Sequence, residues 1–327
     1  METNVEGIVL GLAAIIDYGI GDPKGWCHPV QVMGWTISKM SQWVITHCHE
    51  KGLRRWGGIC LGLGIIFGSG ILGWSIVKLA KTIHPGLGIA IESIMLASCF
   101  AARSLRWAAE DVIDPLMSGN IALARTKLSQ YVGRDTQNLS ELEILRAVLE
   151  TVSENATDGV TAPLFYGIMG AFFPIIGSVP LALAYKAAST LDSMIGYRQE
   201  PFTDIGWFSA KLEDVLTWFP CRLTVLTLAL FSGKPRFILS ICRRDAPQDP
   251  SPNSGWSECV YAAILGVQLG GKNTYQGQPK NKPLLGDSLR PITPEIIAQA
   301  LQLTRLCFLM WLGLALMGLS AIADFLP

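Results

Sequence analysis

Charged residues are scarce in this sequence. They make up 16% of the 327 residues, whereas a soluble globular domain usually carries about 25%. Half of the residues are hydrophobic and the mean hydropathy is +0.36, so too few polar residues remain to coat a water-soluble particle of 35.5 kDa. The 33 glycines and 10 tryptophans fit a membrane protein, where glycine allows close helix packing and tryptophan lies at the interface. The composition therefore excludes a disordered chain and favours a membrane protein.

An excess of basic residues is also lacking, since 26 Lys and Arg balance 26 Asp and Glu, which argues against a nucleic-acid partner. The eight cysteines form no CxxC pair. We therefore expect free thiols in a reducing compartment rather than a zinc knuckle or a disulfide framework. The first seven residues hold two Glu and no basic residue, so no cleavable signal peptide is expected.

Several common enzyme motifs are missing as well. The chain has no GxSxG, no HExxH and no GxGxxG in the context of a dinucleotide site, so hydrolase, zinc-protease and dehydrogenase activities lack support. The segment Gly266–Asn273 (GVQLGGKN) nearly matches a P-loop, but Asn273 stands where the Mg²⁺-binding hydroxyl belongs, and we reject that reading. We expect the segment Thr46–Glu50 (THCHE) to be exposed rather than to bind a metal.

Charge-poor runs predict an all-α, polytopic membrane protein. The expected spans are approximately 7–21, 57–77, 82–102, 159–185, 215–233 and 306–323, within a single membrane-embedded domain that covers residues 1–327. The run 159–185 contains Pro163, Pro174 and Pro180. It either crosses the bilayer or dips in and returns as a broken hairpin, and we favour the hairpin because a crossing would place the segment 186–214 on the outer side.

The distribution of Lys and Arg predicts the orientation of the chain. Five of the 26 lie in segment 22–56, six in 103–158 and nine in 234–305. We therefore expect these three large loops on the cytoplasmic side of the cell membrane and both termini outside. Loops of this size are unusual in a pure channel or carrier, so the sequence indicates a multi-pass, membrane-anchored catalytic body.

The richest segment for chemistry is Gly133–Pro163. Ser140 and Glu143 have the spacing of a capping box, which predicts a helix that begins near Glu141. Its apolar stripe is expected to consist of Leu142, Leu145, Leu149 and Val152. Glu143, Glu150 and Glu154 repeat on another face, and Asn155 and Asp158 continue the acidic end. Such carboxylates suit Mg²⁺ held with water and substrate phosphates, and the alternative is a solvated face that pairs with Arg146.

Basic side chains near these segments leave two interpretations open. Arg134 either grips a carboxylate or phosphate, or forms a pair with Asp135 that ties down a loop. Arg222 lies inside an apolar run, where it either snorkels to the interface or binds substrate. Segment 185–222 also embeds charges among aromatic residues, and such charges are costly near a bilayer unless they are paired or hydrated. These charges are Asp192, Arg198, Asp204, Glu213 and Asp214.

Two turn-rich segments complete the candidate site. The loop DPSPNSGW (249–256) is rich in hydroxyl and backbone donors and precedes a helix that contains Glu258, so it either binds an anion or forms an ordinary turn. The stretch GDPKGWCHPVQVMGW (21–35) contains His28, which we expect to line a site at the membrane surface.

Taken together, these strings resemble one known family. GDP…HPVQVMG, DPLMSGNIALAR…VGRDT, ETVSENATDGVTAPLFY, YKAASTLDSMIGYR, DIGWFSAKLEDV…FPCRLT and SPNSGW…LGVQLGG occur in one order across roughly residues 8–320. The chain resembles the adenosylcobinamide-phosphate synthase family of cobalamin biosynthesis. It departs from that pattern at Ser189, where Asn is expected, and at Asp249, where His is expected.

The resemblance implies an ATP-dependent ligase. It would join adenosylcobyric acid by an amide to (R)-1-aminopropan-2-ol O-phosphate, or to ethanolamine phosphate, with Mg²⁺ neutralising the phosphates. Candidate catalytic residues are Glu150, Glu154, Asp192 and Asp214. Candidate substrate-binding and phosphate-binding residues are Arg134, Asp135, Asn155, Arg198, Arg222, Ser251, Asn253 and His28. Candidate Mg²⁺ ligands are Glu150, Glu154 and Asp158.

Two other classes of function remain open at this point. One is a Mg²⁺-dependent membrane phosphotransferase that acts on a lipid-linked substrate. The other is a transporter or scaffold for corrinoids without catalytic activity. Under the ligase hypothesis, the partners are the corrinoid, the amino-alcohol phosphate and the membrane, together with other late enzymes of the pathway or a second copy of the chain.

Overall fold

The computed structural model describes residues 2–21 and 28–325, which form two compact units. Unit 1 consists of residues 1–103, 162–217 and 309–327, and unit 2 consists of residues 104–161 and 218–308. Helices dominate both units, so the predicted all-α class is confirmed. A single two-stranded hairpin in the described part of the chain is an addition that the sequence patterns did not predict.

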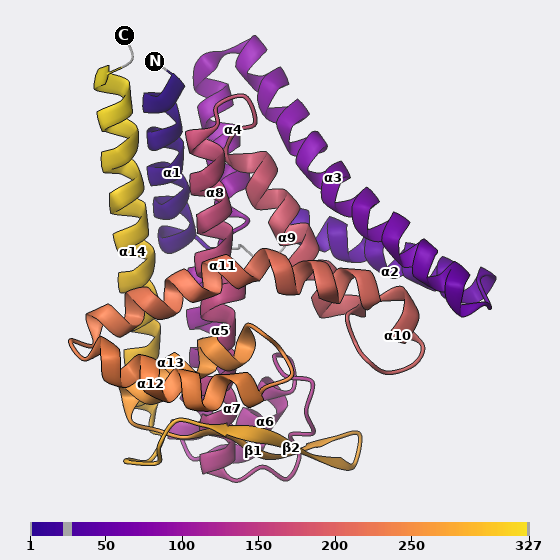
Figure 1. The fold of residues 1–327 in the computed structure, drawn as a ribbon, viewed down its shortest axis with the longest axis vertical. Coiled ribbons are helices and arrows are strands. Elements are labelled where there is room, and N and C mark those ends of the chain that lie inside the picture. The colour runs from indigo at the N-terminus through magenta and orange to yellow at the C-terminus, as the bar shows by residue number, and fades with distance from the viewer. Residues whose placement is uncertain (1, 22–27, 326–327) are drawn as a thin grey trace. The chain divides into compact units, whose positions relative to one another are not determined.

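Unit 1 is built from helices that pack along one another. Its elements are α1 (Glu2–Gly19), α2 (Pro29–His47), α3 (Lys51–Ile83), α4 (Pro85–Ala97), α8 (Ala162–Phe172), α9 (Ser178–Ile195), α10 (Phe202–Ile205), the beginning of α11 (Trp207–Phe231) and the end of α14 (Pro294–Phe325). α3 packs against α9, α4 and α2, and α1 packs against α4 and α8. α1 and the end of α14 lie side by side (Figure 1), where Gly7 faces Leu316.

Glycines on one face of α3 explain its close packing. Gly58, Gly62, Gly70 and Gly73 are all buried and recur at helical spacing. A Cβ atom on Gly58 would collide with the carbonyl of Ile205 in α10. The face therefore admits neighbouring backbones that a larger residue would push away, as in other membrane helix interfaces.

Four described helical stretches are long and apolar enough to cross a membrane: Lys51–Ile83, Pro85–Met117, Trp207–Phe231 and Pro294–Asp324. They include the predicted runs 57–77 and 306–323 and most of 82–102 and 215–233. The predicted spans 7–21 and 159–185 are not among them, and their entry into the bilayer stays a prediction. In the latter run the chain reverses between α8 and α9, which pack against each other.

Unit 2 places a hairpin against a small group of helices (Figure 1). Its elements are α5 (Ala102–Met117), α6 (Ile121–Leu128), α7 (Glu141–Asn155), the π-helical turn η1 (Ala156–Thr161), the remainder of α11, α12 (Pro235–Asp245), the 3₁₀ turn η2 (Ala246–Gln248), α13 (Ser254–Leu265), β1 (Leu269–Tyr275), β2 (Gln278–Leu285) and the beginning of α14. The hairpin contacts α7, α12 and α13.

The hairpin turn forms at Gln276-Gly277, where both residues have positive φ, 50° and 76°. This matches the primed turns that suit two-residue hairpins. The second part of the near-match to a P-loop, residues 269–273, lies in β1, with Gly270 and Gly271 also at positive φ beside a bulge. A P-loop needs a strand, a loop and a helix in succession. The structure therefore agrees with the rejection of a P-loop.

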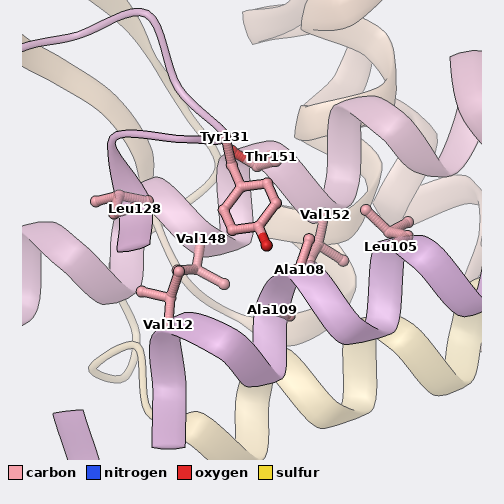
Figure 2. Close-up of a pocket in the computed structure, with 9 residues that line it drawn as sticks. All are labelled: Leu105, Ala108, Ala109, Val112, Leu128, Tyr131, Val148, Thr151 and Val152. Carbon is pink, nitrogen blue, oxygen red and sulfur yellow. The ribbon is translucent and has the colours of Figure 1, made fainter. Parts of the chain in front are cut away.

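The core of unit 2 forms around α5 and α7. Figure 2 shows a small cavity between these helices with the Tyr131 ring directed into it. Its lining is Leu105, Ala108, Ala109, Val112, Leu128, Tyr131, Val148, Thr151 and Val152. This lining is almost entirely apolar, and the Tyr131 hydroxyl donates to Asp111 at 3.1 Å, so the cavity belongs to the packed core. Of the predicted stripe on α7, only Leu142 is exposed, because it lies in the first turn.

Candidate functional site

The helix α7 positions the acidic segment of unit 2. The predicted capping box is confirmed, because Ser140 accepts from the backbone N–H of Glu143 while the Glu143 carboxylate accepts from the backbone N–H of Ser140. The cap fixes where the helix begins and so fixes the direction of each later side chain. Glu150 and Glu154 fall in the last two turns of α7, and Asp158 lies in the π-helical turn that follows.

Glu150 is buried, with 1% of its surface exposed, and both of its oxygens have partners. Oε2 pairs with the Arg134 guanidinium, and Oε1 accepts from the backbone N–H of Gly270 at 2.9 Å. The Nε atom of Arg146 lies 3.9 Å from Oε1. A buried carboxylate is tolerated when cations and hydrogen bonds surround it. The expected pairing with Arg146 is thus present, but the face is not solvated at this position.

Arg134 and Asp135 hold different parts of the site. Arg134 grips the carboxylate of Glu150 and also donates to Oδ1 of Asn273 at 2.9 Å. Asp135 accepts from the backbone N–H groups of Gln276 and Gly277 at 3.0 and 2.8 Å, which fastens the hairpin turn. Arg134 thus pairs with Glu150 and not with Asp135, the loop is tied by Asp135, and the role of Arg134 in binding substrate or phosphate stays a prediction.

A second set of charges lies beside the first. Lys282 of β2 places its Nζ atom 3.2 Å from Oε1 of Glu258 in α13. Burial lowers the pKa of Lys282, but the carboxylates of Glu258, Glu154, Glu150 and Asp249 outweigh this effect and raise it. We call these five residues the acidic cluster.

Two carboxyl groups of the cluster, those of Glu258 and Glu154, have pKa values above the ordinary value. Burial raises the pKa of Glu258 to about 8, and the neighbouring carboxylates Glu154, Glu150 and Asp249 add to this, while Lys282 opposes it. Burial likewise raises the pKa of Glu154. Carboxyl groups with strongly raised pKa values are typical of functional sites, although structural networks also produce them.

The loop 249–256 is held by its own side chains. Asp249 accepts from the backbone N–H of Ser251 at 2.8 Å, and the Ser251 hydroxyl accepts from the N–H groups of Asn253 and Ser254 at 3.2 and 3.1 Å. Arg222 donates to the carbonyl of Pro252 at 2.9 Å. Its guanidinium lies 4.4 Å from the Trp256 ring centre and 5.3 Å from that of Trp218. These contacts fasten the loop to α11, a role that the sequence did not suggest for Arg222.

Other predicted residues lie apart from the acidic cluster or outside unit 2. Asn155 is exposed and donates to the Thr151 carbonyl of its own helix at 2.9 Å. His28, Asp192, Arg198 and Asp214 belong to unit 1 and are not among the residues that unit 2 brings together. His28 caps α2 by accepting from the N–H of Val30 at 3.3 Å, and Lys211 donates to Asp214 at 3.3 Å. The roles predicted for these five residues stay predictions, and residues 22–27 of the His28 segment lie outside the described residues.

Lys282, Asn273 and Asp249 belong to the site although sequence reasoning gave them no role, and Glu258 was noted only as part of a helix. Lys282 and Asn273 lie on the hairpin, whose Gln-Gly turn is a weaker signal than Asn-Gly or Asp-Gly. A predicted hairpin would have directed attention to the lysines of β2. The seven cysteines in the described residues are free, as expected, and Cys27 lies outside them.

The described residues contain no group of three or more His, Cys, Asp or Glu side chains arranged to hold a metal ion. Glu150 is buried and accepts from Arg134 and Gly270, whereas Glu154 and Asp158 of the predicted set are partly exposed. Mg²⁺ is usually held by one or two carboxylates together with water and substrate phosphates. Glu154 and Asp158 therefore fit this mode of binding better than an all-protein cage.

Comparison with known proteins places the chain in a family. A family model described as CobD/CbiB protein matches residues 10–304. A cobalamin biosynthesis protein CobD from Synechocystis sp. is 58% identical over 315 residues, which is 96% of this chain and 92% of the relative. A CobD from Halalkalibacterium halodurans is 42% identical, covering 94% and 95%, and a cobalamin biosynthesis protein CbiB from Salmonella arizonae is 41% identical, covering 89% and 91%. No solved structure matches. The resemblance seen in the motifs is thus confirmed, and the chain belongs to the CobD/CbiB family.

Proposed function

We propose that this protein acts in cobalamin biosynthesis as an ATP-dependent amide ligase. It would join the carboxyl group of adenosylcobyric acid to the amine of (R)-1-aminopropan-2-ol O-phosphate or of ethanolamine phosphate, with release of ADP and phosphate. The observation that carries the proposal is family membership over nearly the whole length of both chains, with relatives named cobalamin biosynthesis proteins.

The charges gathered in unit 2 support this chemistry. The reaction brings together a carboxylate, phosphates and an amine, so its site needs both acidic and cationic side chains. Unit 2 supplies Arg134, Arg146 and Lys282 next to Glu150, Glu154 and Glu258. Arg134 and Arg146 are committed to Glu150 and the hairpin, so they hold the geometry of the site. Arg198, which is exposed, is left as the predicted contact for an anionic group.

Mg²⁺ and ATP fit the donor set of unit 2. When bound, Mg²⁺ would neutralise phosphate charge during phosphoryl transfer. We propose that Glu154 and Asp158 hold it, because both are partly exposed and Asp158 follows Glu154 by four residues. The nearby loop 249–256 adds backbone and hydroxyl groups before the N-terminus of α13, where an anion is favoured.

The proposal includes a position in the cell membrane. In the described part of the chain, four helical stretches are long and apolar enough to cross it. Most Lys and Arg residues lie in the segments 22–56, 103–158 and 234–305, and the positive-inside rule then places these segments in the cytoplasm. The protein would therefore be multi-pass, with its catalytic loops on the side where ATP is available.

The test is a reaction with the purified full-length protein in detergent. The protein is incubated with adenosylcobyric acid, aminopropanol phosphate and Mg-ATP, and the products are separated by mass-resolved chromatography. We expect an amide product and ADP in equal amounts, and neither when the amine or the corrinoid is omitted. Absence of both products would overturn the ligase, and uptake of corrinoid into proteoliposomes without ATP cleavage would indicate a transporter instead.

A further inference from the structure

One carboxylate oxygen of Glu258 makes no hydrogen bond to any described residue. The residue is fully buried, and its Oε1 atom is 3.2 Å from Lys282. Its Oε2 atom is buried too, and among the described residues it has no hydrogen-bond partner. An unsatisfied buried acceptor is costly, and in native proteins it calls for an explanation such as a ligand.

The balance of charge around Glu258 points to a missing cation. Glu150 is matched by Arg134 and Arg146. The remaining carboxylates of the acidic cluster, Glu154, Asp249 and Glu258, interact with Lys282, and Glu154 interacts with Arg134 as well. Burial and the neighbouring carboxylates raise the pKa of Glu258 to about 8, because Lys282 alone does not offset them, and Oε2 of Glu258 has no partner among the described residues. A second cation at this oxygen would stabilise the ionised form of Glu258 and supply the missing partner.

The geometry favours an ammonium group over a metal ion. Mg²⁺ draws its ligand oxygens to about 2.1 Å, which requires tightly converging carboxylates. The described side chains do not converge in that way. An ammonium group donates hydrogen bonds of about 2.8 Å and so reaches oxygens that lie farther apart. Lys282 shows that these carboxylates accept from a primary ammonium.

We infer that Glu258 and Asp249 bind the primary ammonium group of the amine substrate, with Oε2 of Glu258 at the closed end of the site. The identity of this ligand rests on the proposed function. Glu154 and Asp249 are partly exposed and Lys282 is about a quarter exposed, so the ligand would enter from their side. Lys282 holds Oε1 of Glu258 and leaves Oε2 for the substrate, which makes Lys282 a positioning residue.

The first experiment needs no variant. Binding of three probes to the full-length protein in detergent is measured by titration calorimetry, without ATP or corrinoid. The probes are O-phosphoethanolamine, ethyl phosphate, which lacks the amine, and O-phosphocholine, whose nitrogen cannot donate hydrogen bonds. We expect phosphoethanolamine to bind at least about tenfold more tightly than the other two, the effect of one charge-assisted hydrogen bond. Equal affinity for all three would overturn the inference.

The second experiment assigns the effect to Glu258. The variant Glu258→Gln keeps the shape of the side chain and should lower the affinity for phosphoethanolamine to that for ethyl phosphate, whose own binding should not change. The matched control is Glu295→Gln, which removes the same charge from an exposed position at the start of α14 and should bind like the unmodified protein. A variant that retains full preference for the amine, or loses only Mg²⁺ binding, would refute the assignment.

The inference and the proposed function can fail separately. If the amine is preferred but no amide product forms, the ammonium site stands and the ligase fails. If product forms and Glu258→Gln leaves the KM for the amine unchanged, the ligase stands and the ammonium site fails. If Glu258→Gln does not yield folded protein, the comparison of the three probes on the unmodified chain still tests whether the protein binds an ammonium group, and equal affinities would overturn the inference.

Discussion

At the scale of single residues, Glu150 and Glu154 differ in role although they lie one turn apart on α7. Glu150 is buried and fully engaged by Arg134 and Gly270, whereas Glu154 is partly exposed at the edge of the acidic cluster. A buried charge that is paired with other groups mainly affects the stability of the fold. A charge that ligands can reach is a candidate for binding or catalysis. The two residues should therefore respond differently to substitution.

For the buried pair, we expect Arg134→Met to destabilise the protein by about 3 kcal/mol, because it removes the guanidinium in direct contact with the buried Glu150 carboxylate and leaves only Arg146, 3.9 Å away, as a cation. The double variant Arg134→Met with Glu150→Leu should cost less than the single variant, since no buried charge remains. Thermal unfolding in detergent compares the three proteins. A double variant less stable than the single one would show that the pair contributes net stability by itself.

For the open carboxylate, Glu154→Gln should reduce kcat at least about a hundredfold if it holds Mg²⁺ or substrate. Its unfolding temperature should stay close to that of the unmodified protein, because the side chain is partly exposed and the substitution preserves its shape. Steady-state kinetics and thermal unfolding are measured on the same preparation. Normal turnover would remove Glu154 from the site.

At the scale of elements, the start of α7 and the hairpin decide where the site forms. The capping box fixes the first turn of α7, and Asp135 fastens the hairpin turn by accepting from two backbone N–H groups. Arg146 joins the two elements by donating to the carbonyls of Gly270 and Lys272. The hairpin thus brings Asn273 to α7, which lies more than 100 residues earlier in the chain, and Lys282 to Glu258 of α13.

The capping box yields a prediction for α7. Ser140→Ala should lower stability by about 1 kcal/mol, the usual effect of losing a side-chain N-cap. Ser129→Ala is a fitting control, because Ser129 bonds only within its own short turn. The stability of both variants is measured by thermal unfolding. An equal loss of stability in the two variants would show that the N-cap at Ser140 does not stabilise α7 more than an ordinary turn contact does.

Glu143 adds a pH dependence to the same element. Its hydrogen bonds from the backbone and side chain of Ser140 lower the pKa of Glu143 below its ordinary value of 4.5. The stabilisation is therefore complete above pH 4.5 and is lost as the pH falls through the lowered pKa. Glu143→Gln should be less stable than the unmodified protein at pH 6, and the gap should narrow at pH 3. A gap that widens on acidification would contradict this account.

At the scale of the whole molecule, the chain passes between the two units four times, so each unit is assembled from segments that are distant in sequence. The acidic cluster lies entirely within unit 2. The predicted contributions of Asp192, Asp214, Arg198 and His28 come from unit 1. They are best tested through the orientation of the loops in the membrane.

Orientation is tested by cysteine labelling of intact cells in a cysteine-free background. A cysteine at Gln199 reports on segment 186–214 and one at Gln137 reports on segment 103–158, and both positions are exposed. If both loops are cytoplasmic, a membrane-impermeant maleimide should label neither until the cells are opened. Labelling of Gln199→Cys from outside would show that the run 159–185 crosses the bilayer. The segments 103–158 and 186–214 would then lie on opposite sides of the membrane.

Much of this protein follows from local patterns. The scarcity of charge predicted membrane helices, and four helices of suitable length and composition are present. The spacing of Ser140 and Glu143 predicted the start of α7 within one residue. Such features depend on neighbours three or four positions apart, which the sequence displays directly. The hairpin escaped prediction because its turn lacks the strongest signal and its glycines break the strand pattern.

The sequence by itself determined the class of protein, the free thiols, the acidic segment and the family, because each depends on composition, spacing or a match along the chain. Only the tertiary structure decided that Glu150 is buried against Arg134 and Gly270 and that Glu258 meets Lys282 with one oxygen unused. These contacts join two helices, a hairpin and a loop. The pairing of these charges depends on the reversal of the chain at Gln276-Gly277 and on how the hairpin packs against the helices. Helical periodicity carries no information about either feature.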